Sequence, residues 1–402
     1  MLHPVDRAAP RWAALLDDAA AGIYVHIPFC DRICPYCDFA VVRTRERAIE
    51  RYCAALETEI ARATVPAGGI ATIYFGGGTP SALPAARIAA LIDRLCTKFG
   101  CRRGDLECTL EANPSRGSED LNRWREAGVN RLSVGVQSFD DDELHRLGRD
   151  HSAAGAAQFL GAASAAGFEN VSLDLIAGVP GQSRASFAAS LAAAAASPAT
   201  HISIYGLTVE TGTPYAAWFA RDPVAFPDEE IVADQLETAH DALDAAGFSH
   251  YEISNFARPG WESAHNIGYW RQRDCLAFGM SAAGYDRGLR YANHRAFDDY
   301  CSAIEAGGSA RTNEETLSAA RRIGEAAMLA LRMDAGIVYA DFTRRFGIDA
   351  ATVFRAARKK CSAAGLLEDD GARARLTGRG LLLANSVCAE FLSPDLSRNE
   401  PT

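Results

Sequence analysis

Three cysteines near the N-terminus have the spacing of a metal-binding loop. Cys30, Cys34 and Cys37 follow the pattern C-x3-C-x2-C within HIPFCDRICPYCDF, directly after the apolar run 23–27. Three thiolates on one short loop can bind three irons of a [4Fe–4S] cluster and leave the fourth iron without a protein ligand. An iron with an open position can bind a small molecule. The spacing therefore predicts a reactive cluster site and not only an electron store.

These cysteines have two other interpretations. A structural zinc site needs a fourth Cys or His, and the nearest candidate, His26, lies in a predicted strand. Unligated cysteines are also common in hydrophobic cores. However, Pro28 and Pro35 give this segment the character of a turn. We therefore favour the cluster.

Composition narrows the class of protein. The chain has 402 residues, of which 48% are hydrophobic and 23% charged, as in globular proteins with more than one domain. The net charge of −10 and the lack of a Lys/Arg run argue against nucleic acid as the main partner. Eleven cysteines, three of them on one loop, favour a reducing compartment over a disulfide framework. No signal peptide or transmembrane segment is predicted, so we expect a cytoplasmic protein that can associate peripherally with membranes through partners.

Strand-like and helix-like segments alternate in the first half of the chain. The predicted strands are 23–27, 71–75, 107–111, 131–136, 171–176 and 201–205, and the predicted helices are 45–62, 84–99, 118–127, 153–166 and 183–195. This alternation indicates parallel βαβ units. Because chemistry-bearing residues recur at many strand ends, an α/β barrel, partial or full, is favoured over a doubly wound dinucleotide fold.

Polar and glycine residues follow several predicted strands. The turn 76–79 (GGGT) follows the second strand, Glu111 and Gln137 end the third and fourth, and Asp174 lies in the fifth. The active site of a parallel βα barrel gathers at the C-terminal strand ends. We therefore expect these residues to face one mouth together with the cysteine loop. The glycine turn matches neither a dinucleotide nor a P-loop fingerprint, and alone it could be a plain tight turn.

The second half of the chain has a different pattern. A helix is predicted from an Asp228 N-cap to Ala246, and three helices with a hairpin at 366–377 are predicted in a small winged-helix-like domain. Its arginines are interpreted as solvated helix faces. The predicted divisions are an N-terminal extension (1–21), a barrel core (22–225), a barrel extension (226–310), the winged-helix-like domain (311–392) and a tail (393–402).

Together these motifs resemble radical S-adenosylmethionine (SAM) proteins of the coproporphyrinogen III oxidase-like family, over nearly the whole chain. The resemblance implies a partial (β/α)6 TIM-like barrel with a C-terminal winged-helix-like domain. It also implies that the open iron chelates the amino and carboxylate groups of SAM. The SAM contacts that it implies are Tyr24, Tyr36, Gly77, Gly78, Thr79, Glu111, Gln137, Arg149 and Asp174. In isolation, Arg149 would be interpreted as a surface ion pair and Asp174 as a buried hydrogen-bond centre. The carboxylates can accept from amino or hydroxyl groups, and Arg149 can pair with a carboxylate.

Two features distinguish branches of this family. Its coproporphyrinogen III dehydrogenases typically carry another cysteine two residues after the third cluster ligand, where this chain has Phe39. The segment 265–270 (HNIGYW) matches the H-N-x-x-Y-W motif of the heme-chaperone branch. A histidine can ligate heme iron, and aromatic rings can pack on a porphyrin. The resemblance thus implies heme as cargo, bound through His265, Asn266, Tyr269 and Trp270. In isolation, the motif would be a satisfied surface histidine beside packed aromatic residues.

The expected function is to hand this heme to apo-hemoproteins, such as those of a respiratory chain. The alternative is a dehydrogenase, in which a 5′-deoxyadenosyl radical abstracts hydrogen from propionates to give vinyl groups, or a methyl-transfer or ring-opening enzyme. These alternatives require an electron donor for the cluster. Whether the chain is an enzyme, and whether it forms a homodimer, stays open.

One segment departs from the family pattern. Ala283 and Gly284 replace the usual His-Ser, and Cys275 replaces an aromatic residue. Cys275 is a small core residue or an alternative thiolate ligand for heme.

Overall fold

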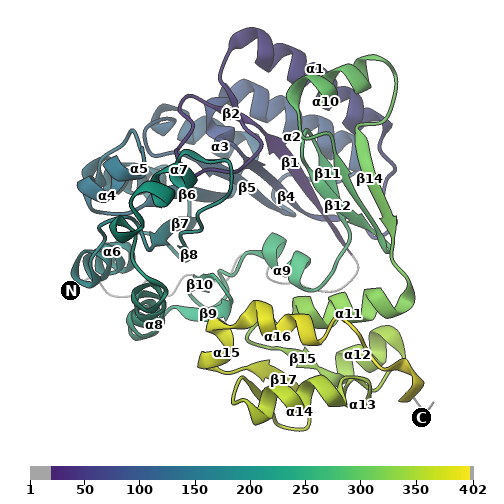
Figure 1. Cartoon of the computed structure of the whole chain (residues 1–402). Coiled ribbons are helices and arrows are strands. Elements are labelled where there is room, and N and C mark those ends of the chain that lie inside the picture. The colour runs from purple at the N-terminus through teal and green to yellow at the C-terminus, as the bar shows by residue number, and fades with distance from the viewer. Residues whose placement is uncertain (1–19, 399–402) are drawn as a thin grey trace.

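A twelve-stranded sheet forms the body of this computed structural model, which describes residues 20–398 (Figure 1). The predicted extension 1–21 and tail 393–402 lie mostly or partly outside these residues. Six central strands are parallel and adjacent in chain order. They are β1 (Ala21–Ile27), β4 (Ile70–Gly77), β5 (Glu107–Ala112), β6 (Arg131–Gln137), β7 (Asn170–Ala177) and β8 (His201–Gly206). This arrangement confirms the predicted parallel α/β fold.

Side chains alternate along these strands between a helix-facing side and the barrel interior. Residues such as Ile73, Leu132 and Leu173 are fully buried and belong to the main hydrophobic core. Successive strand residues point to opposite faces of a sheet. The intervening positions are therefore on the interior face, and many of them are polar, including Thr72 and Asp174. The apolar side chains on the helix-facing side thus form the core between the sheet and the helices, and the polar side chains line the barrel interior.

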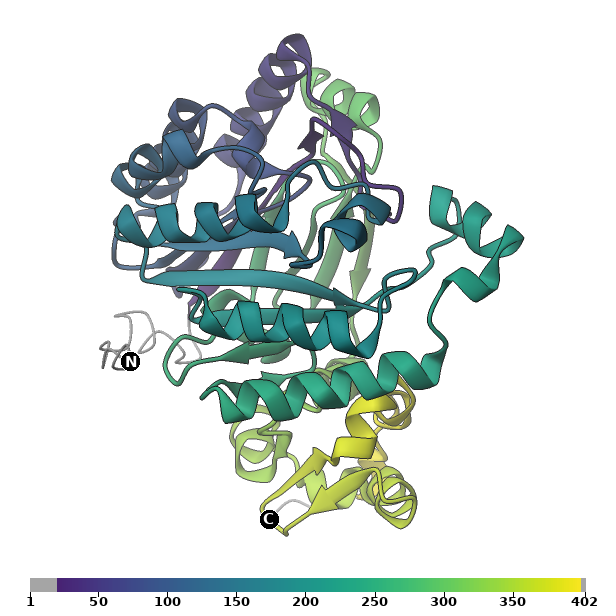
Figure 2. The same cartoon turned by 90° about the vertical axis from the view of Figure 1, so that its left-hand side faces the viewer.

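Helices on the outer face bury the apolar half. They are α1 (Glu46–Arg62), α2 (Ala85–Phe99), α3 (Leu121–Ala127), α5 (Ala153–Ala165) and α6 (Arg184–Ala196). Each overlaps a helix that the sequence predicts. Side-chain caps from Ser152 and Ser183 begin α5 and α6. A further short helix, α4 (Asp141–Arg146), was not predicted, and the Asp140 carboxylate caps it. Figure 2 shows these helices covering one face of the strands.

Both edges of the parallel sheet are extended. At one edge, β8 is followed by α7 (Pro214–Arg221), α8 (Glu229–Ala245) and the hairpin β9–β10 (Ser249–Glu252, Asn255–Ala257). The expected Asp228 cap forms, since its carboxylate accepts from the Ile231 N–H at 2.8 Å. At the other edge, β11 (Cys275–Phe278) pairs in parallel with β1 and continues into β12 (Ala283–Asp286), β13 (Leu289–Asn293), α10 (Phe297–Glu305) and β14 (Arg311–Thr316).

A short helix, α9 (Ala264–Trp270), lies between the N-terminal ends of the strands and the C-terminal part of the chain (Figure 1). Its first two backbone N–H groups donate to the carboxylate of Glu107, which begins β5, at 3.1 and 3.0 Å. A buried carboxylate at a helix start satisfies N–H groups that have no partner in the helix. Glu107 therefore fixes α9 beneath the barrel.

The C-terminal part has its own hydrophobic core and a three-stranded sheet. Up to residue 398 it contains six α-helices, where three were predicted, and two of the three additional helices arise where the chain breaks at Phe354 and Leu383. They are α11 (Ala319–Ala330), α12 (Tyr339–Phe346), α13 (Ala350–Val353), α14 (Arg355–Ala363), α15 (Gly378–Leu382) and α16 (Ala384–Glu390), beside β15 (Ile337–Val338), β16 (Leu367–Asp369) and β17 (Arg373–Leu376). The predicted hairpin is β16–β17.

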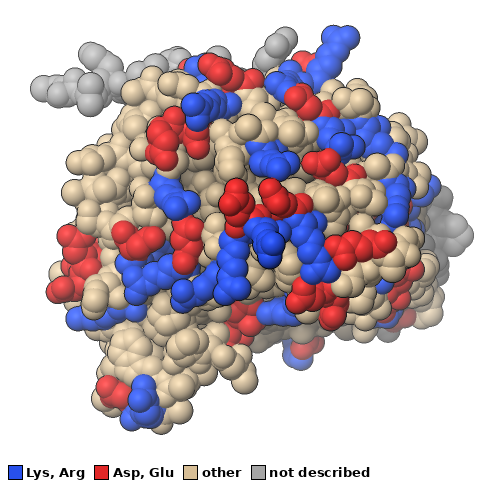
Figure 3. All heavy atoms as spheres, turned by 90° about the horizontal axis from the view of Figure 1, so that it is seen from above, with Lys and Arg blue, Asp and Glu red and all other residues tan. Residues whose placement is uncertain are grey.

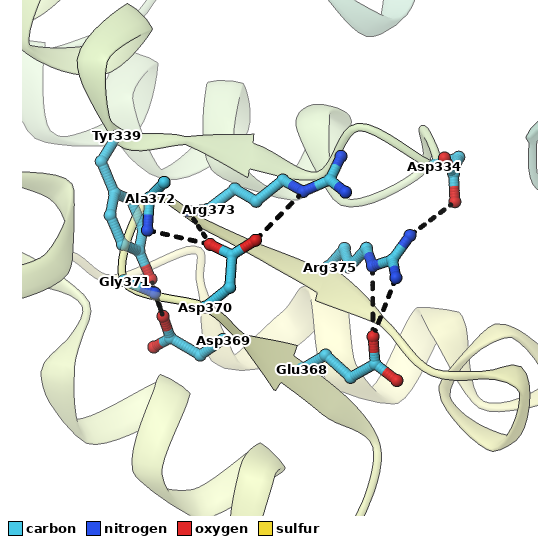
Figure 4. A network of polar contacts seen from close by, with 9 residues as sticks. All are labelled: Asp334, Tyr339, Glu368, Asp369, Asp370, Gly371, Ala372, Arg373 and Arg375. Atoms are coloured by element: carbon cyan, nitrogen blue, oxygen red, sulfur yellow. Dashed lines mark hydrogen bonds and ion pairs between the residues drawn. The ribbon is translucent and has the colours of Figure 1, made fainter.

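Polar contacts fix the turn of this hairpin (Figure 4). The Asp370 carboxylate accepts from the N–H groups of Ala372 and Arg373, both at 2.9 Å. The Asp369 carboxylate accepts from the Gly371 N–H at 3.1 Å and from the Tyr339 hydroxyl at 2.9 Å. Gly371 has φ of 84°, which glycine adopts without steric cost. The tight turn, as in a winged-helix hairpin, thus follows from Asp-Asp-Gly.

Charges of both signs alternate on the face above α1 and α10 (Figure 3). Arg51 of α1 pairs across this face with Asp298 and Glu305 of α10, both at 2.7 Å. No helix within residues 20–398 combines the length and the apolar character needed to cross a bilayer.

Candidate functional site

The three cysteines lie on a loop beyond the C-terminal end of β1. The two-stranded pair β2 (Phe29–Cys30) and β3 (Val42–Arg43) holds the ends of this loop together. The Cys37 N–H donates to the Cys34 carbonyl at 3.1 Å, and Cys30 Sγ lies 3.4 Å from Thr79 Oγ1. All three thiols are free, and those of Cys34 and Cys37 are half-buried. The loop is therefore folded without any cross-link between its cysteines.

This donor set fits an iron–sulfur cluster better than zinc. Burial raises the pKa of the Cys30 thiol to about 11 and also raises that of Cys37, so their thiolates need a bound cation. Within the described residues, no three Cys, His, Asp or Glu side chains converge on a single ion. Cluster ligands need not converge in this way, because each binds a different iron. The His26 ring bonds to the Ala40 carbonyl at 2.9 Å and to Tyr24, so it is not a spare zinc ligand.

Arg149 joins the cysteine loop to two strand ends. One guanidinium nitrogen donates to Cys34 Sγ at 3.6 Å, and the other donates to Asn113 Oδ1 at 3.1 Å and to the Gly135 carbonyl at 2.7 Å. Its Nε is buried and has no hydrogen-bond partner among the described residues. Arg149 thus places a positive charge beside the cysteines, with one donor unused.

Two carboxylates lie deeper in the same mouth. Burial raises the pKa of Glu111 to about 7 and that of Asp174 to about 6. Glu111 accepts from the Tyr74 hydroxyl at 2.9 Å and from the Gly77 N–H at 3.0 Å. Both groups are thus held close to the point of ionisation. A bound cationic group, such as an ammonium, would favour their charged form.

Gln137 and the glycine turn complete the rim. Gln137 ends β6 with φ of 72°, a region that few residues other than glycine adopt. Gly77 and Gly78 pack against the protein itself, since a Cβ would overlap the His26 ring at Gly77 and lie 2.7 Å from the Pro28 carbonyl oxygen at Gly78. These glycines bring the turn close to the cysteine loop, where Thr79 contacts Cys30.

The two predicted tyrosines lie at different depths. Tyr36 lies on the cysteine loop and packs edge-on against Tyr215 at 6.0 Å between ring centroids. Tyr24 is inside the barrel, stacked on Tyr74 at 6.2 Å and hydrogen-bonded to His26. Tyr36 therefore borders the cysteines, whereas Tyr24 borders the barrel interior.

The H-N-x-x-Y-W segment lies at the opposite end of the strands, on α9. The His265 side chain is only 3% exposed. Its Nδ1 bonds to Thr72 Oγ1 at 2.7 Å, its Nε2 bonds to Tyr269 Oη at 3.1 Å, and its ring stacks on Tyr74. Burial lowers the pKa of His265 to about 3, and Arg131 acts in the same direction. The ring is thus neutral and fully hydrogen-bonded in this conformation. The histidine of the motif is therefore buried, not at the surface as an isolated motif would suggest, while Asn266, Tyr269 and Trp270 are half-buried.

The departures from the family pattern have a local explanation. A Cβ at Gly284 would overlap the Tyr291 ring. The Tyr291 hydroxyl accepts a hydrogen bond from the Ala277 N–H at 2.9 Å, which holds the ring in this place. Cys275 is buried with Sγ 3.7 Å from Tyr269 Oη, and burial raises its thiol pKa to about 12. Cys275 is therefore a protonated core residue next to the H-N-x-x-Y-W helix.

Sequence reasoning missed several residues of both regions. Asn113 accepts from Arg149, Tyr74 contacts both Glu111 and His265, and Glu107 holds α9. A signal was available, because Glu107, like Glu111, occupies an interior position of β5 at period two. No local pattern indicated its partner, which lies more than 150 residues away.

Two parts of the chain match models of known protein families. Residues 24–194 match the family model of the radical SAM superfamily, and residues 317–383 match that of the HemN C-terminal domain. Among solved structures, coproporphyrinogen III oxidase (HemN) from Escherichia coli, described as a radical SAM enzyme, superposes with a TM-score of 0.81. It is 25% identical, with 95% of this chain and 92% of that chain covered.

Curated relatives match over almost the whole length. The heme chaperone HemW of Bacillus subtilis is 35% identical over 92% of this chain and 98% of its own length. The heme chaperone HemW of Mycobacterium tuberculosis H37Rv is 37% identical over 92% and 94%. A mitochondrial radical S-adenosyl methionine domain-containing protein 1 of Bos taurus is 32% identical over 93% and 87%.

Proposed function

This chain belongs to the HemW heme-chaperone family of the radical SAM superfamily, and we propose that it binds heme and transfers it to apo-hemoproteins. The observation that carries the proposal is the near-full-length similarity to heme chaperones. Phe39, 71% exposed beside the cysteine loop where the family's dehydrogenases have a cysteine, supports it. Family membership implies a [4Fe–4S] cluster and SAM as cofactors.

Cys30, Cys34 and Cys37 would hold the cluster, which when bound supplies an open iron and a source of one electron. Arg149, already beside Cys34, would neutralise a carboxylate of SAM. Glu111 and Asp174 would accept from its amino or hydroxyl groups, aided by Gln137 at the end of β6. Tyr36, Tyr24 and the turn Gly77–Thr79 would enclose the ligand.

The heme would bind through His265, Asn266, Tyr269 and Trp270. A neutral imidazole is the form that ligates iron, and burial keeps His265 neutral. However, iron can reach this ring only if its bonds to Thr72 and Tyr269 break and α9 shifts. We therefore propose that a minor conformation, with α9 displaced from the barrel, is the one that accepts heme.

The test pairs two assays on the full-length protein. Purified protein is titrated with heme and then mixed with an apo-hemoprotein, while a second sample is incubated anaerobically with coproporphyrinogen III, SAM and a reductant. We expect heme binding, recovery of hemoprotein absorbance and no protoporphyrinogen. Robust decarboxylation would instead establish the dehydrogenase alternative. The structural similarity to HemN is the reason for testing this alternative.

A further inference from the structure

Two cysteines outside the cluster loop lie next to each other at the end of α2. Cys96 is in the last turn of this helix, and Cys101 follows Gly100, the residue at which the helix ends. Both thiols are free and half-buried, so small molecules in the solvent can reach them. The proposed function uses neither residue, and the pair is therefore a separate set of reactive thiols.

The backbone at the end of α2 places these two side chains together. Gly100 has φ of 68°, the left-handed conformation that commonly ends a helix. The Cys96 carbonyl accepts from the Gly100 N–H and, at 3.2 Å, from the Cys101 N–H. A helix end of this kind brings the side chain after the glycine against the side chain five residues before it. Both side chains are cysteines here, so the backbone preforms a dithiol.

A hydrogen bond between the two sulfurs gives them different roles. The Cys96 thiol donates to the Cys101 sulfur, and this bond lowers the pKa of Cys101 while it raises that of Cys96. The thiolate is the nucleophilic form of a cysteine. Cys101 is therefore the attacking sulfur, and Cys96, held beside it, is the resolving sulfur. An accessible thiolate next to a resolving cysteine is the arrangement of a redox-sensitive site.

We propose that Cys96 and Cys101 form a reversible redox site, which hydrogen peroxide converts to a disulfide. The Cys101 sulfur attacks one peroxide oxygen, the O–O bond breaks, and the second oxygen leaves as hydroxide, which gains a proton to become water. The Cys96 sulfur then attacks the Cys101 sulfenic acid. The S–S bond forms as the S–O bond breaks, and the Cys96 proton leaves with the departing hydroxide as a second water. Two thiols are thus oxidised, one peroxide is reduced, and a thiol reductant reverses the change.

Other cysteines of the described chain are matched controls. Cys108, near the start of β5, is buried, and Cys361 and Cys388 are both buried in the C-terminal core. Burial raises the pKa of all three thiols. Buried cysteines that stay protonated react slowly. We therefore expect these three to remain reduced under conditions that oxidise the pair at the end of α2.

Peptide mapping of the full-length protein with a reconstituted cluster tests this inference. The protein receives one equivalent of hydrogen peroxide without oxygen, its free thiols are blocked with N-ethylmaleimide in urea, and it is digested with trypsin without reduction. Cleavage after Arg94, Lys98 and Arg102 separates the two cysteines, so the disulfide links the peptide 95–98 to the peptide 99–102. We expect mass spectrometry to find this linked pair as the main disulfide, and dithiothreitol to remove it.

Two variants test the roles of the sulfurs. In Cys96→Ser the resolving sulfur is absent, so the Cys101 sulfenic acid should persist and react with dimedone. In Cys101→Ser no dimedone adduct is expected at Cys96, and an adduct there would reverse the assigned roles. Equal melting temperatures before oxidation show that both variants fold.

Other results of the wild-type mapping would overturn the redox site, even where a variant fails to fold. One is the recovery of both α2 thiols as maleimide adducts after peroxide treatment. Another is a disulfide that links either peptide to Cys108. Equal formation of a Cys361–Cys388 disulfide would show that the oxidation is unselective. None of these results depends on heme, so the inference and the proposed function can fail separately.

Discussion

Arg149 connects the cysteine loop to the ends of two strands. It contacts Cys34, Asn113 and the Gly135 carbonyl. We expect Arg149→Gln to weaken SAM binding by about tenfold, because a charge-assisted bond to the carboxylate is lost. Equilibrium dialysis of SAM against protein with a reconstituted cluster measures this. Arg123→Gln, on the outer surface of α3, is the control, and equal affinity in both variants would show that Arg149 is structural.

His265 raises a different question, because its ring is both the predicted heme ligand and a packed core group. If iron must compete with the hydroxyls of Thr72 and Tyr269, then Thr72→Val/Tyr269→Phe should raise the population of the accessible ring and strengthen heme binding. His265→Ala should weaken heme binding in the same titration.

The variants Thr72→Val/Tyr269→Phe and His265→Ala together show whether His265 is a heme ligand or only a packed core residue. A purely structural His265 would give lower melting temperatures in both variants with no gain of heme affinity in the first. The Soret band of heme bound to His265→Ala would also be the same as that of heme bound to the wild type. That result would transfer the ligand role to another group.

At the scale of elements, the short helix α15 offers a stringent test of the C-terminal packing. A Cβ at Gly380 would overlap the Leu366 carbonyl oxygen, whereas a Cβ at Gly378 in the same helix meets nothing within 4 Å. We expect Gly380→Ala to lower the free energy of unfolding by about 1–3 kcal/mol, as overpacking does. Gly378→Ala should be neutral or slightly stabilising. Urea unfolding followed by far-UV circular dichroism compares them, and equal midpoints would contradict the tight α15 packing.

The elements also show where sequence reasoning succeeds. The six parallel strands were predictable, because apolar residues such as Ile73 and Leu173 recur in runs between helical periods. The position of α9 was not, since it depends on Glu107 contacting backbone groups at 264 and 265. Likewise, the segment after Thr316 divides into more helices than its apolar period indicates. Local patterns specify elements, whereas long-range polar contacts specify where irregular elements dock.

At the scale of the whole molecule, the two candidate sites lie at opposite ends of the same strands. The cysteine loop follows β1 and adjoins the turn after β4, whereas His265 contacts Thr72 near the start of β4. About five strand residues, or roughly 16 Å at 3.3 Å per residue, separate Thr72 from the turn. Heme and SAM would therefore not share contacts, although both border the barrel interior.

This separation predicts that heme binding does not require the cluster. Cys34→Ser should abolish the iron–sulfur absorbance and SAM binding, because a cluster ligand is lost. It should leave heme affinity within about twofold of the wild type, because Cys34 and His265 have no contact partner in common among the described residues. Heme titration of the variant and the wild type, with and without SAM, measures this. If heme affinity falls tenfold while the melting temperature holds, the two sites are coupled through Tyr74, which contacts both Glu111 and His265.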